Sequence, residues 1–250
     1  MKGVILAGGT GSRLFPLTKV TNKHLLPVGR KPMIYHPIEK LTEAGIEEIL
    51  IVTGVEHMGD VVGLLGSGKD FACPPKPGGR RRGCRFTYKV QDEAGGIAQA
   101  LFLARTFVGQ DSMAVILGDN IFGDDLKPFA DSFNKQKKGA RVLVKEVSDP
   151  QRFGVVELKD GKITSIEEKP EKPKSNFVIT GIYFYDHEVF DIISGLKPSA
   201  RGEFEISDVN RAYLQKGRLA YDILSGWWTD AGTFESIERA TLFSEGRVQL

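Results

Sequence analysis

The sequence LAGGTGSRL spans residues 6–14, and its first two residues end a short apolar run at residues 3–7. A glycine-rich loop after a first strand is typical of α/β proteins that bind phosphate, because glycine lets backbone N–H groups approach an anion closely. Arg13 adds a positively charged guanidinium, which can donate two parallel hydrogen bonds to a phosphate. Tight turns after strands also need glycine, so the loop alone leaves both interpretations open. Its spacing fits neither a Walker A loop nor the dinucleotide pattern G-x-G-x-x-G.

Short β-branched runs alternate with longer segments of helical period beyond this loop. The pattern predicts strands at residues 3–7, 48–53, 86–90 and 113–117, and helices at residues 32–44, 56–65, 97–107 and 126–136. A βαβα order of this kind is typical of a mainly parallel sheet with helices on its faces. We therefore expect a ligand crevice at the carboxyl ends of these strands.

The pattern changes past Gly139, where strand-like pieces follow one another. They lie at residues 140–147, 153–158, 163–167 and 177–185, with Asp160-Gly161 as a hairpin turn signal, and helices return at residues 186–193, 205–216 and 233–243. The expected fold is α/β, with a Rossmann-like, mainly parallel but mixed sheet flanked by helices and a smaller β-rich part. We expect one domain over residues 1–250, with halves at about 1–138 and 139–250.

Composition argues against several classes of partner. Lys and Arg total 34 against 32 Asp and Glu, so a net charge of +2 offers no electrostatic reason to expect nucleic acid or a membrane surface. No apolar run approaches the roughly 20 residues that span a bilayer. The start of the chain lacks the features of a secretory signal. We expect a soluble, cytoplasmic protein.

Residues 73–84 stand apart because they are rich in proline, glycine and arginine. The composition predicts an exposed loop between two regular elements. Three consecutive arginines could contact phosphate, but so short a charge run is usually a solvated surface. Two cysteines are too few for a disulfide scaffold, although Cys73 and Cys84 could pair under oxidising conditions.

Further motifs make the glycine-rich loop specific. It is followed by Pro16 and Thr18, by KHLLPV at residues 23–28, and by KPMIY at residues 31–35. The chain resembles the nucleoside-diphosphate-sugar pyrophosphorylase, or sugar nucleotidyltransferase, family over nearly its whole length. Within that family it is most similar to the short glucose-1-phosphate thymidylyltransferases, whose opening pattern is L-A-G-G-x-G-x-R-L-x-P-x-T with a downstream K-x-L-L-P-V.

The resemblance implies a nucleotide site in the first half of the chain. Arg13 and Lys23 are implied to hold the triphosphate and its α-phosphoryl region, and a glutamine followed by a glycine backbone to read a pyrimidine. A primary amide both donates and accepts, as pairing to a pyrimidine requires. The implied nucleotide-binding residues are Leu6, Gly8, Gly9, Thr10, Gly11, Gln91 and Gly96.

Two carboxylates far apart in sequence are candidates for a metal site. Asp119 follows a hydrophobic strand, and Asp230 lies in WWTDAGT, which resembles the family's W-x-D-x-G-T. An aspartate at a strand end is often only a helix cap. The resemblance favours Mg²⁺ binding by the pair, since Mg²⁺ prefers carboxylate and phosphate oxygens.

The second half is implied to bind the sugar phosphate. The implied residues are Gly154, Glu168 and the Ile179 backbone for hydroxyl groups and Lys169 for the phosphate. The family usually has tyrosine where Phe153 stands, so a contact through that hydroxyl is absent. Glu203 is a further candidate to face the sugar.

The implied reaction is Mg²⁺-dependent, in-line attack of glucose 1-phosphate on the α-phosphate of dTTP, with Arg13, Lys23, Asp119 and Asp230 as the catalytic set. Two alternatives are an enzyme that uses UTP in place of dTTP and a non-catalytic sensor of nucleotide sugars. The glycine spacing disfavours an oxidoreductase.

A homo-oligomer is expected. Longer members carry an extra helical segment for tetramer contacts and a feedback site, so we expect weak inhibition through such a site.

Overall fold

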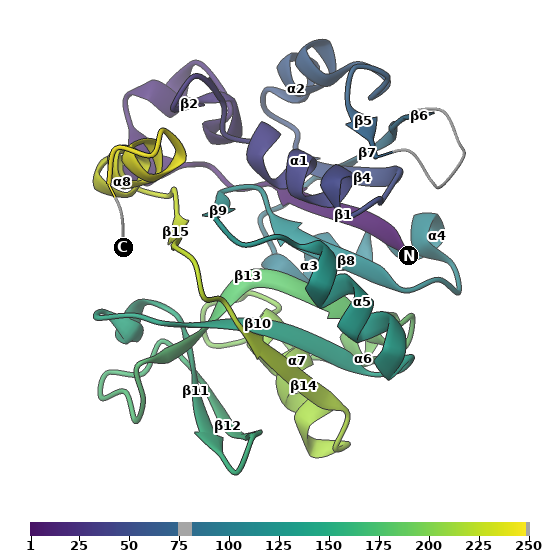
Figure 1. Cartoon of the computed structure of the whole chain (residues 1–250), viewed down its shortest axis with the longest axis vertical. Helices are drawn as coiled ribbons and strands as arrows, with labels where there is room; N and C mark the ends of the chain where they lie inside the picture. The colour runs from purple at the N-terminus through teal and green to yellow at the C-terminus, as the bar shows by residue number, and fades with distance from the viewer. Residues whose placement is uncertain (75–81, 249–250) are drawn as a thin grey trace.

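The strand that precedes the glycine-rich loop, β1 (Lys2–Ala7), lies inside the sheet of the computed structural model, which describes residues 1–74 and 82–248 (Figure 1). Within those residues nine strands form one sheet, in the order β12-β11-β13-β8-β1-β4-β7, with β10 paired to β13 and β14 to β10. The other bounds are β4 (Glu48–Gly54), β7 (Arg85–Gln91), β8 (Met113–Leu117), β10 (Ala140–Glu146), β11 (Gly154–Lys159), β12 (Lys162–Glu168), β13 (Phe177–Tyr185) and β14 (Leu219–Ile223).

The sheet has a parallel part, formed by the first half of the chain, and a part that joins it in the antiparallel sense. β8, β1, β4 and β7 are parallel neighbours, whereas β13 pairs with β8 in the antiparallel sense and carries the strands of the second half. The expected α/β fold with a mixed, largely parallel sheet is confirmed. No helix in the described parts of the chain is long and apolar enough to cross a bilayer.

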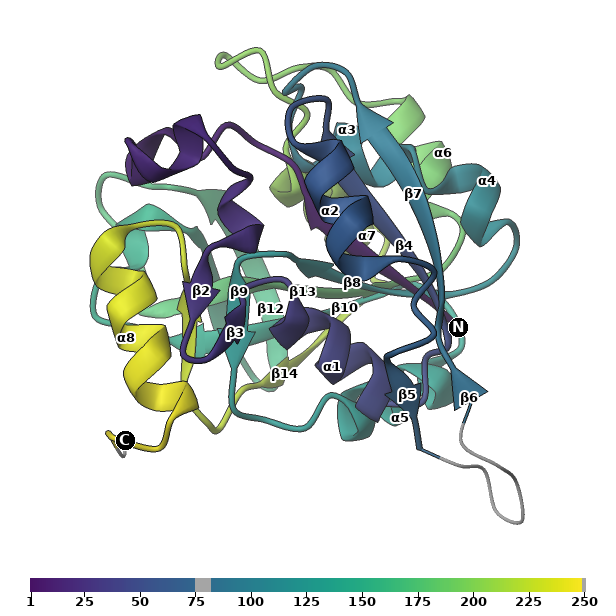
Figure 2. The same cartoon turned by 90° about the horizontal axis from the view of Figure 1, so that it is seen from above.

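Two apolar cores cover the two faces of the sheet. Along β1, Val4 and Leu6 enter one core and Ile5 and Ala7 the other. The first face is covered by α3 (Ile97–Phe102), α4 (Arg105–Val108), α6 (Val189–Ser194) and α7 (Ile206–Gln215), and the second by α1 (Tyr35–Glu43), α2 (Met58–Leu65) and α5 (Lys127–Gln136) (Figure 2). Coverage on both faces explains why these strands are continuous apolar runs in the sequence.

The last helix, α8 (Phe234–Ser244), packs beside the N-terminal hairpin of β2 (Pro27–Val28) and β3 (Lys31–Pro32) (Figure 2). Thr233 begins the helix with a capping box that includes Ser236. The Gly29 amide donates to the Thr241 hydroxyl at 3.0 Å. The last helix is therefore joined to a hairpin from the first part of the chain.

Several elements differ from the sequence prediction. The helix expected at residues 97–107 is broken into α3 and α4, where the Ala104 amide donates to Leu101 in a tighter, three-residue turn. The helix expected at residues 186–193 begins only at Val189. Short strands that were not predicted include β14, β9 (Asn120–Phe122) and β15 (Trp228–Asp230), as well as β2 and β3.

The predicted exposed loop lies mostly outside the described residues, which resume at Arg82. Its ends form a small hairpin of β5 (Ala72–Cys73) and β6 (Arg82–Gly83). Cys73 and Cys84 are buried, free thiols whose Sγ atoms lie 3.1 Å apart. Burial and the contact with Cys73 raise the pKa of Cys84 to about 12.

Candidate active site

The implied nucleotide residues gather at one edge of the sheet. The glycine-rich loop follows β1, Gln91 ends β7, and Asp119 follows β8. Because β1, β7 and β8 all run in the same direction, their carboxyl ends meet at this edge, where open α/β sheets bind ligands. β13 runs the other way, so its first residues, including Ile179, reach the same edge from the second half.

Three adjoining hollows lie along this edge, and we name them the loop, middle and C-terminal cavities. They measure about 330, 240 and 410 Å³. The loop and middle cavities share Gly9, Lys23 and Gln91. The middle and C-terminal cavities share Asp119, which therefore stands where the two halves of the molecule meet.

The structure brings nearly all of the sequence candidates to these cavities. The loop cavity is also lined by Thr10, and the middle cavity by Leu6, Gly8 and Gly96. The C-terminal cavity is lined by Arg13, Gly154, Glu168, Lys169, Ile179 and Asp230. Gly11 is not among the lining residues; it occupies the N-cap of the short turn Ser12–Leu14 that presents Arg13. Glu203 lines the middle cavity and not the C-terminal one.

A larger hollow of about 710 Å³ lies between α1, the β2–β3 hairpin and α8. Its walls combine charged residues, such as Arg30 and Glu39, with the stacked rings of Trp227 and Phe243. Neither Asp119 nor the glycine-rich loop lines it, so the chemistry-bearing groups favour the three adjoining cavities over this larger one.

Asp119 is held ionised by its neighbours. Burial opposes its charge, but the Lys23 ammonium at 2.6 Å, together with a hydrogen bond from the Asn120 amide at 3.0 Å, outweighs that effect and lowers the pKa of Asp119. The Lys23 and Asp119 side chains are only 13% and 14% exposed, so solvent screens the pair weakly. The Asp119 carboxylate and the Lys23 ammonium thus form a buried ion pair between the two halves of the site.

Asp230 reaches Asp119 through the antiparallel pairing of β9 with β15. Asp230 is the cross-strand neighbour of Asn120, and the Ala231 amide donates to the Asp119 carbonyl at 2.7 Å. Burial raises the pKa of Asp230, and Asp119 adds to that effect while the nearby Arg152 opposes it. Two carboxylates that line one cavity, where the charge of Asp119 raises the pKa of Asp230, are a donor set suited to a divalent cation.

Arg152 is a site residue that the sequence prediction missed. Its guanidinium contacts Asp230 at 3.2 Å and Asp149 at 2.8 Å, and it lies over the Phe153 ring at 5.0 Å. The three-residue turn Pro150–Arg152, directly before the predicted strand, presents it to the C-terminal cavity. In the sequence it was only an arginine before a predicted strand, so no motif marked it.

Asn120 was also missed, although it adjoins a predicted candidate. Its side-chain oxygen accepts from the Gly181 amide at 2.9 Å and from the Trp228 indole at 2.8 Å. Its amide nitrogen donates to Asp119. Asn120 therefore ties the β9–β15 pair, β13 and the Asp119 carboxylate into one arrangement.

The Gln91 amide has a defined orientation. Its nitrogen donates to the Gln99 side chain at 2.8 Å and to the Gly96 carbonyl at 3.3 Å, while Gln99 also accepts from the Gly95 amide. These bonds leave the Gln91 oxygen as the available acceptor. That oxygen lies close to Gly8, since a Cβ on Gly8 would be 2.7 Å from it, so a side chain at this position would displace the Gln91 amide from its present place.

The sugar-phosphate candidates share one wall of the C-terminal cavity. Gly154 pairs with Glu168 on β12 and with Ile179 on β13. Lys169 has a φ of 43°, a conformation that is uncommon for a residue with a side chain and often marks functional sites. Its ammonium lies 3.7 Å from Glu168, and its backbone amide donates to Phe153 at 3.0 Å.

Two buried histidines should make the fold sensitive to acid. Burial, with Lys23 near one and Lys31 near the other, lowers the pKa of His24 to about 3 and that of His36 to about 4. Below pH ~6.5 the unfolded chain binds protons that the folded chain does not, so stability falls as the pH falls from there to about 4. The free energy of unfolding should drop by up to about 1.4 kcal/mol per pH unit for each histidine.

Urea unfolding at a series of pH values between neutrality and the folded pKa of His36 measures this loss. His36→Gln should flatten the pH dependence, because glutamine does not titrate, whereas His187→Gln at a partly exposed position serves as the matched control. The same slope in the parent protein and in His36→Gln would contradict the assignment.

Comparison with known proteins decides the family. The model of the family described as nucleotidyl transferase matches residues 2–246. This chain belongs to that family. It is 45% identical to a glucose-1-phosphate thymidylyltransferase of Neisseria meningitidis over 97% of this chain and 82% of the relative. It is 42% identical to a protein of the same name from Mycobacterium tuberculosis, again over 97% of this chain and 82% of the relative.

Solved structures agree with this nucleotidyltransferase assignment. A Bacillus anthracis protein described as a glucose-1-phosphate thymidylyltransferase, solved with sucrose, is 59% identical with a TM-score of 0.90, over 98% of this chain and 95% of that one. A UDP-glucose pyrophosphorylase in complex with UDP-glucose is 26% identical with a TM-score of 0.84, over 99% of both chains. The resemblance to sugar nucleotidyltransferases is confirmed.

Proposed function

We propose that this protein is a glucose-1-phosphate thymidylyltransferase, which joins dTTP to glucose 1-phosphate to give dTDP-glucose and pyrophosphate. The observation that carries the proposal is that the middle and C-terminal cavities meet at Asp119. A glycine-rich loop and an oriented amide lie on one side, and Gly154, Glu168 and Lys169 on the other. Two substrates bound in these cavities would have their reacting phosphates side by side.

The base is proposed to bind in the middle cavity against Gln91. The available Gln91 oxygen can accept the N3–H of thymine or uracil, whereas N3 of cytosine is itself an acceptor and would face it unfavourably. The geometry therefore favours thymine or uracil. An extra methyl group in an apolar pocket discriminates by only about 1 to 3 kcal/mol. We therefore expect the site to distinguish dTTP from UTP less strongly than it distinguishes either of them from dCTP.

The reaction needs no general base from the protein. A phosphate monoester has its second pKa near 6, so the sugar phosphate is already a nucleophile at neutral pH. Its oxygen attacks the α-phosphorus in line, the new P–O bond forms as the bond to the β-phosphate oxygen breaks, and pyrophosphate leaves with the electron pair. The protein's work is to position both phosphates and to neutralise the charge that develops.

Each charged group has a place in this arrangement. The Gly8 to Gly11 amides and Arg13 hold the triphosphate, Lys23 the α-phosphoryl group, and Lys169 the attacking phosphate. Asp119 and Asp230 would hold Mg²⁺, which when bound neutralises and orients phosphate oxygens. We further propose that the protein works as a homo-oligomer in the cytoplasm on small-molecule substrates, with no nucleic-acid or membrane partner.

A substrate matrix tests the function. Pyrophosphate release is measured with dTTP, UTP and dCTP against glucose 1-phosphate and other hexose 1-phosphates, with Mg²⁺ and with a chelator. We expect the highest kcat/KM for dTTP with glucose 1-phosphate, little turnover with dCTP, and none without the cation. A preference for UTP would replace the proposal by a uridylyltransferase. Nucleotide-sugar binding without turnover would favour the non-catalytic sensor.

A further inference from the structure

The two cysteines of the chain lie in contact with each other, away from the candidate active site. The Sγ atoms of Cys73 and Cys84 are 3.1 Å apart, so a shift of about 1 Å would bring them to the ~2.05 Å length of a disulfide bond. The two residues are only 1% and 3% exposed. Neither lines the loop, middle or C-terminal cavity, so the proposed reaction gives no reason for the pair.

The hairpin of β5 and β6 determines how the two thiols meet. Cys73 is the cross-strand neighbour of Arg82, and the Cys84 amide donates to the Phe71 carbonyl at 2.9 Å. Cys73 and Cys84 are thus diagonal neighbours on one face of the hairpin, because residues two apart on a strand share a face. A two-stranded ribbon twists strongly, and this twist shortens one of the diagonals between its strands. The contact between the thiols therefore follows from the pairing of the two strands.

The surroundings of the pair do not suit a structural metal ion. Such a zinc site needs four ligands, which are mostly Cys and His. No group of three or more His, Cys, Asp or Glu side chains that could hold a metal occurs in residues 1–74 and 82–248, and residues 75–81 contain none of these types. The remaining contact of Cys73 is a long hydrogen bond from its thiol to the Ile46 carbonyl at 3.5 Å. The chemistry that the geometry favours is therefore a bond between the two sulfur atoms.

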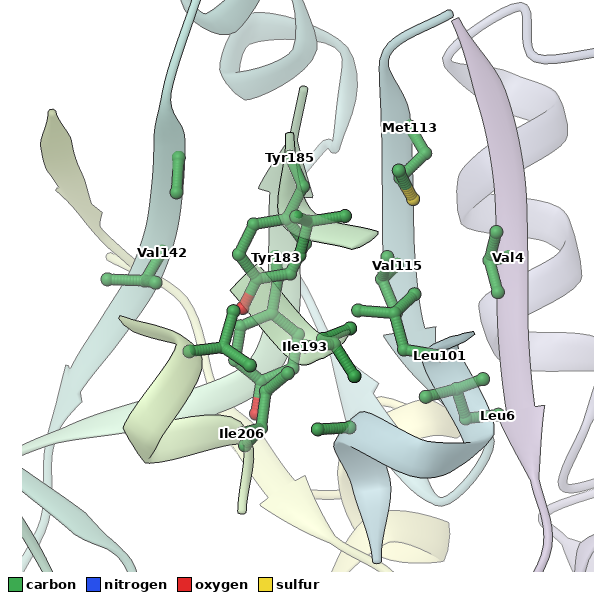
Figure 3. Close-up of a cluster of buried hydrophobic side chains, with 14 of the residues drawn as sticks. Val4, Leu6, Leu101, Met113, Val115, Val142, Tyr183, Tyr185, Ile193 and Ile206 are labelled. Atoms are coloured by element: carbon green, nitrogen blue, oxygen red, sulfur yellow. The ribbon is translucent and has the colours of Figure 1, made fainter. Parts of the chain in front are cut away.

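A bond at this position is compatible with the folded protein. The first core packs Val4, Val115 and Tyr185 closely together (Figure 3), and a shift of about 1 Å there would disturb many contacts. Neither cysteine is a member of that core or of the second one. The hairpin that carries them has strands of two residues each, so a small adjustment there affects few neighbours.

We propose that Cys73 and Cys84 form a reversible disulfide bond, which closes residues 73–84 into a covalent loop and stabilises the oxidised protein. The oxidant is a small-molecule disulfide such as oxidised glutathione. One cysteine thiolate attacks a sulfur of the oxidant and releases one thiol, and the second cysteine then loses its proton, attacks the mixed disulfide and releases the other. The two protein thiols lose two electrons and two protons, and the oxidant becomes two thiols. The inference does not depend on the proposed function.

Burial should make this reaction slow. It raises the pKa of both thiols, that of Cys84 to about 12, and the thiolate is the form that attacks. A hydrogen bond from Cys84 opposes the rise at Cys73, so Cys73 is the sulfur that attacks first. Local opening of so short a hairpin exposes both thiols without global unfolding. We therefore expect oxidation to be faster at alkaline pH and in urea below the unfolding transition.

Thiol counting and mass spectrometry on the whole protein test the inference. After incubation with oxidised glutathione at alkaline pH, the free thiols counted in denaturant should fall from two to none, and the intact mass should fall by two hydrogen atoms. Trypsin digestion in denaturant without reductant should then give the peptide of Cys73 linked to the peptide of Cys84, because arginines at positions 80–82 separate the two cysteines. Two free thiols after the same incubation in urea below the unfolding transition, or bonds between two chains instead of within one, would overturn the inference.

Cys84→Ala is the matched control, and Cys73→Ala serves the same purpose. With one thiol left, the mass rises by one glutathione or stays the same, but it does not fall by two hydrogen atoms. The oxidised parent protein should melt about 3 to 8 °C above its reduced form, because the bond restricts the unfolded chain. This difference should be absent in both variants. Equal melting temperatures for the oxidised and reduced parent protein would refute the stabilising role.

Discussion

Asp119→Asn is expected to lower kcat by about a thousandfold, at the upper end of the effect of removing one charged or oriented group from a transition-state site. The substitution keeps the shape of the side chain but removes the charge that pairs with Lys23 at 2.6 Å and that, with Asp230, would hold the cation. The variant would then lack the carboxylate that helps to hold the cation where the middle and C-terminal cavities meet.

The substitution should leave the protein folded. Lys23 loses its partner in a poorly solvated place, which should cost about 1 to 3 kcal/mol of stability. Steady-state kinetics at increasing Mg²⁺, together with thermal unfolding, separates the two effects. Asp131→Asn is the control, because Asp131 pairs with Lys127 on the exposed side of α5 and should not affect turnover. A fall in kcat of less than tenfold for Asp119→Asn would remove Asp119 from the catalytic set.

Arg13→Ala should lower kcat by about a hundredfold to a thousandfold. Arg13 is exposed on the turn after the glycine-rich loop, yet it lines the C-terminal cavity together with Asp119 and Asp230. Gly232 makes this approach feasible, since a Cβ there would be 2.9 Å from the guanidinium. The fork can bind two phosphate oxygens at once, which no neutral residue replaces.

Arg13→Lys separates charge from geometry. Lysine keeps the positive charge but not the planar fork, so it should recover only part of the lost turnover. Arg105→Ala serves as the control, because Arg105 lies on α4 and contacts the exposed Asp191 at 3.6 Å. Pyrophosphate release by Arg13→Ala within twofold of the parent rate would refute the role.

The strands and helices with strong patterns were predictable. β1, β4, β8 and β13 are continuous apolar runs because both faces of the sheet are covered. β14 was missed, since its side chains are mostly half-exposed and it lies at the sheet's margin beside β10. β9 and β15 are three residues long, too short for a periodic signal.

The residues of the candidate site also fall into two groups, those that a motif predicted and those that no motif marked. Gln91 and the glycine-rich loop belong to contiguous motifs, so their gathering at one sheet edge follows from strand order. Arg152 carries no comparable signal, because an arginine before a strand is ordinary in a sequence. Only the turn at residues 150–152 presents it to the C-terminal cavity.

The sequence by itself determined the parallel α/β half, the loop after β1 and the family, because these depend on local periodicity and on runs of consecutive residues. The tertiary structure alone decided how Asp119 meets Asp230, 111 positions later, through the β9–β15 pairing and the Ala231 amide. It also decided that the Asn120 side chain accepts from the Gly181 amide of β13 and from the Trp228 indole of β15. Both depend on packing between segments that are far apart in the sequence. The secondary-structure propensities of neighbouring residues do not encode such contacts.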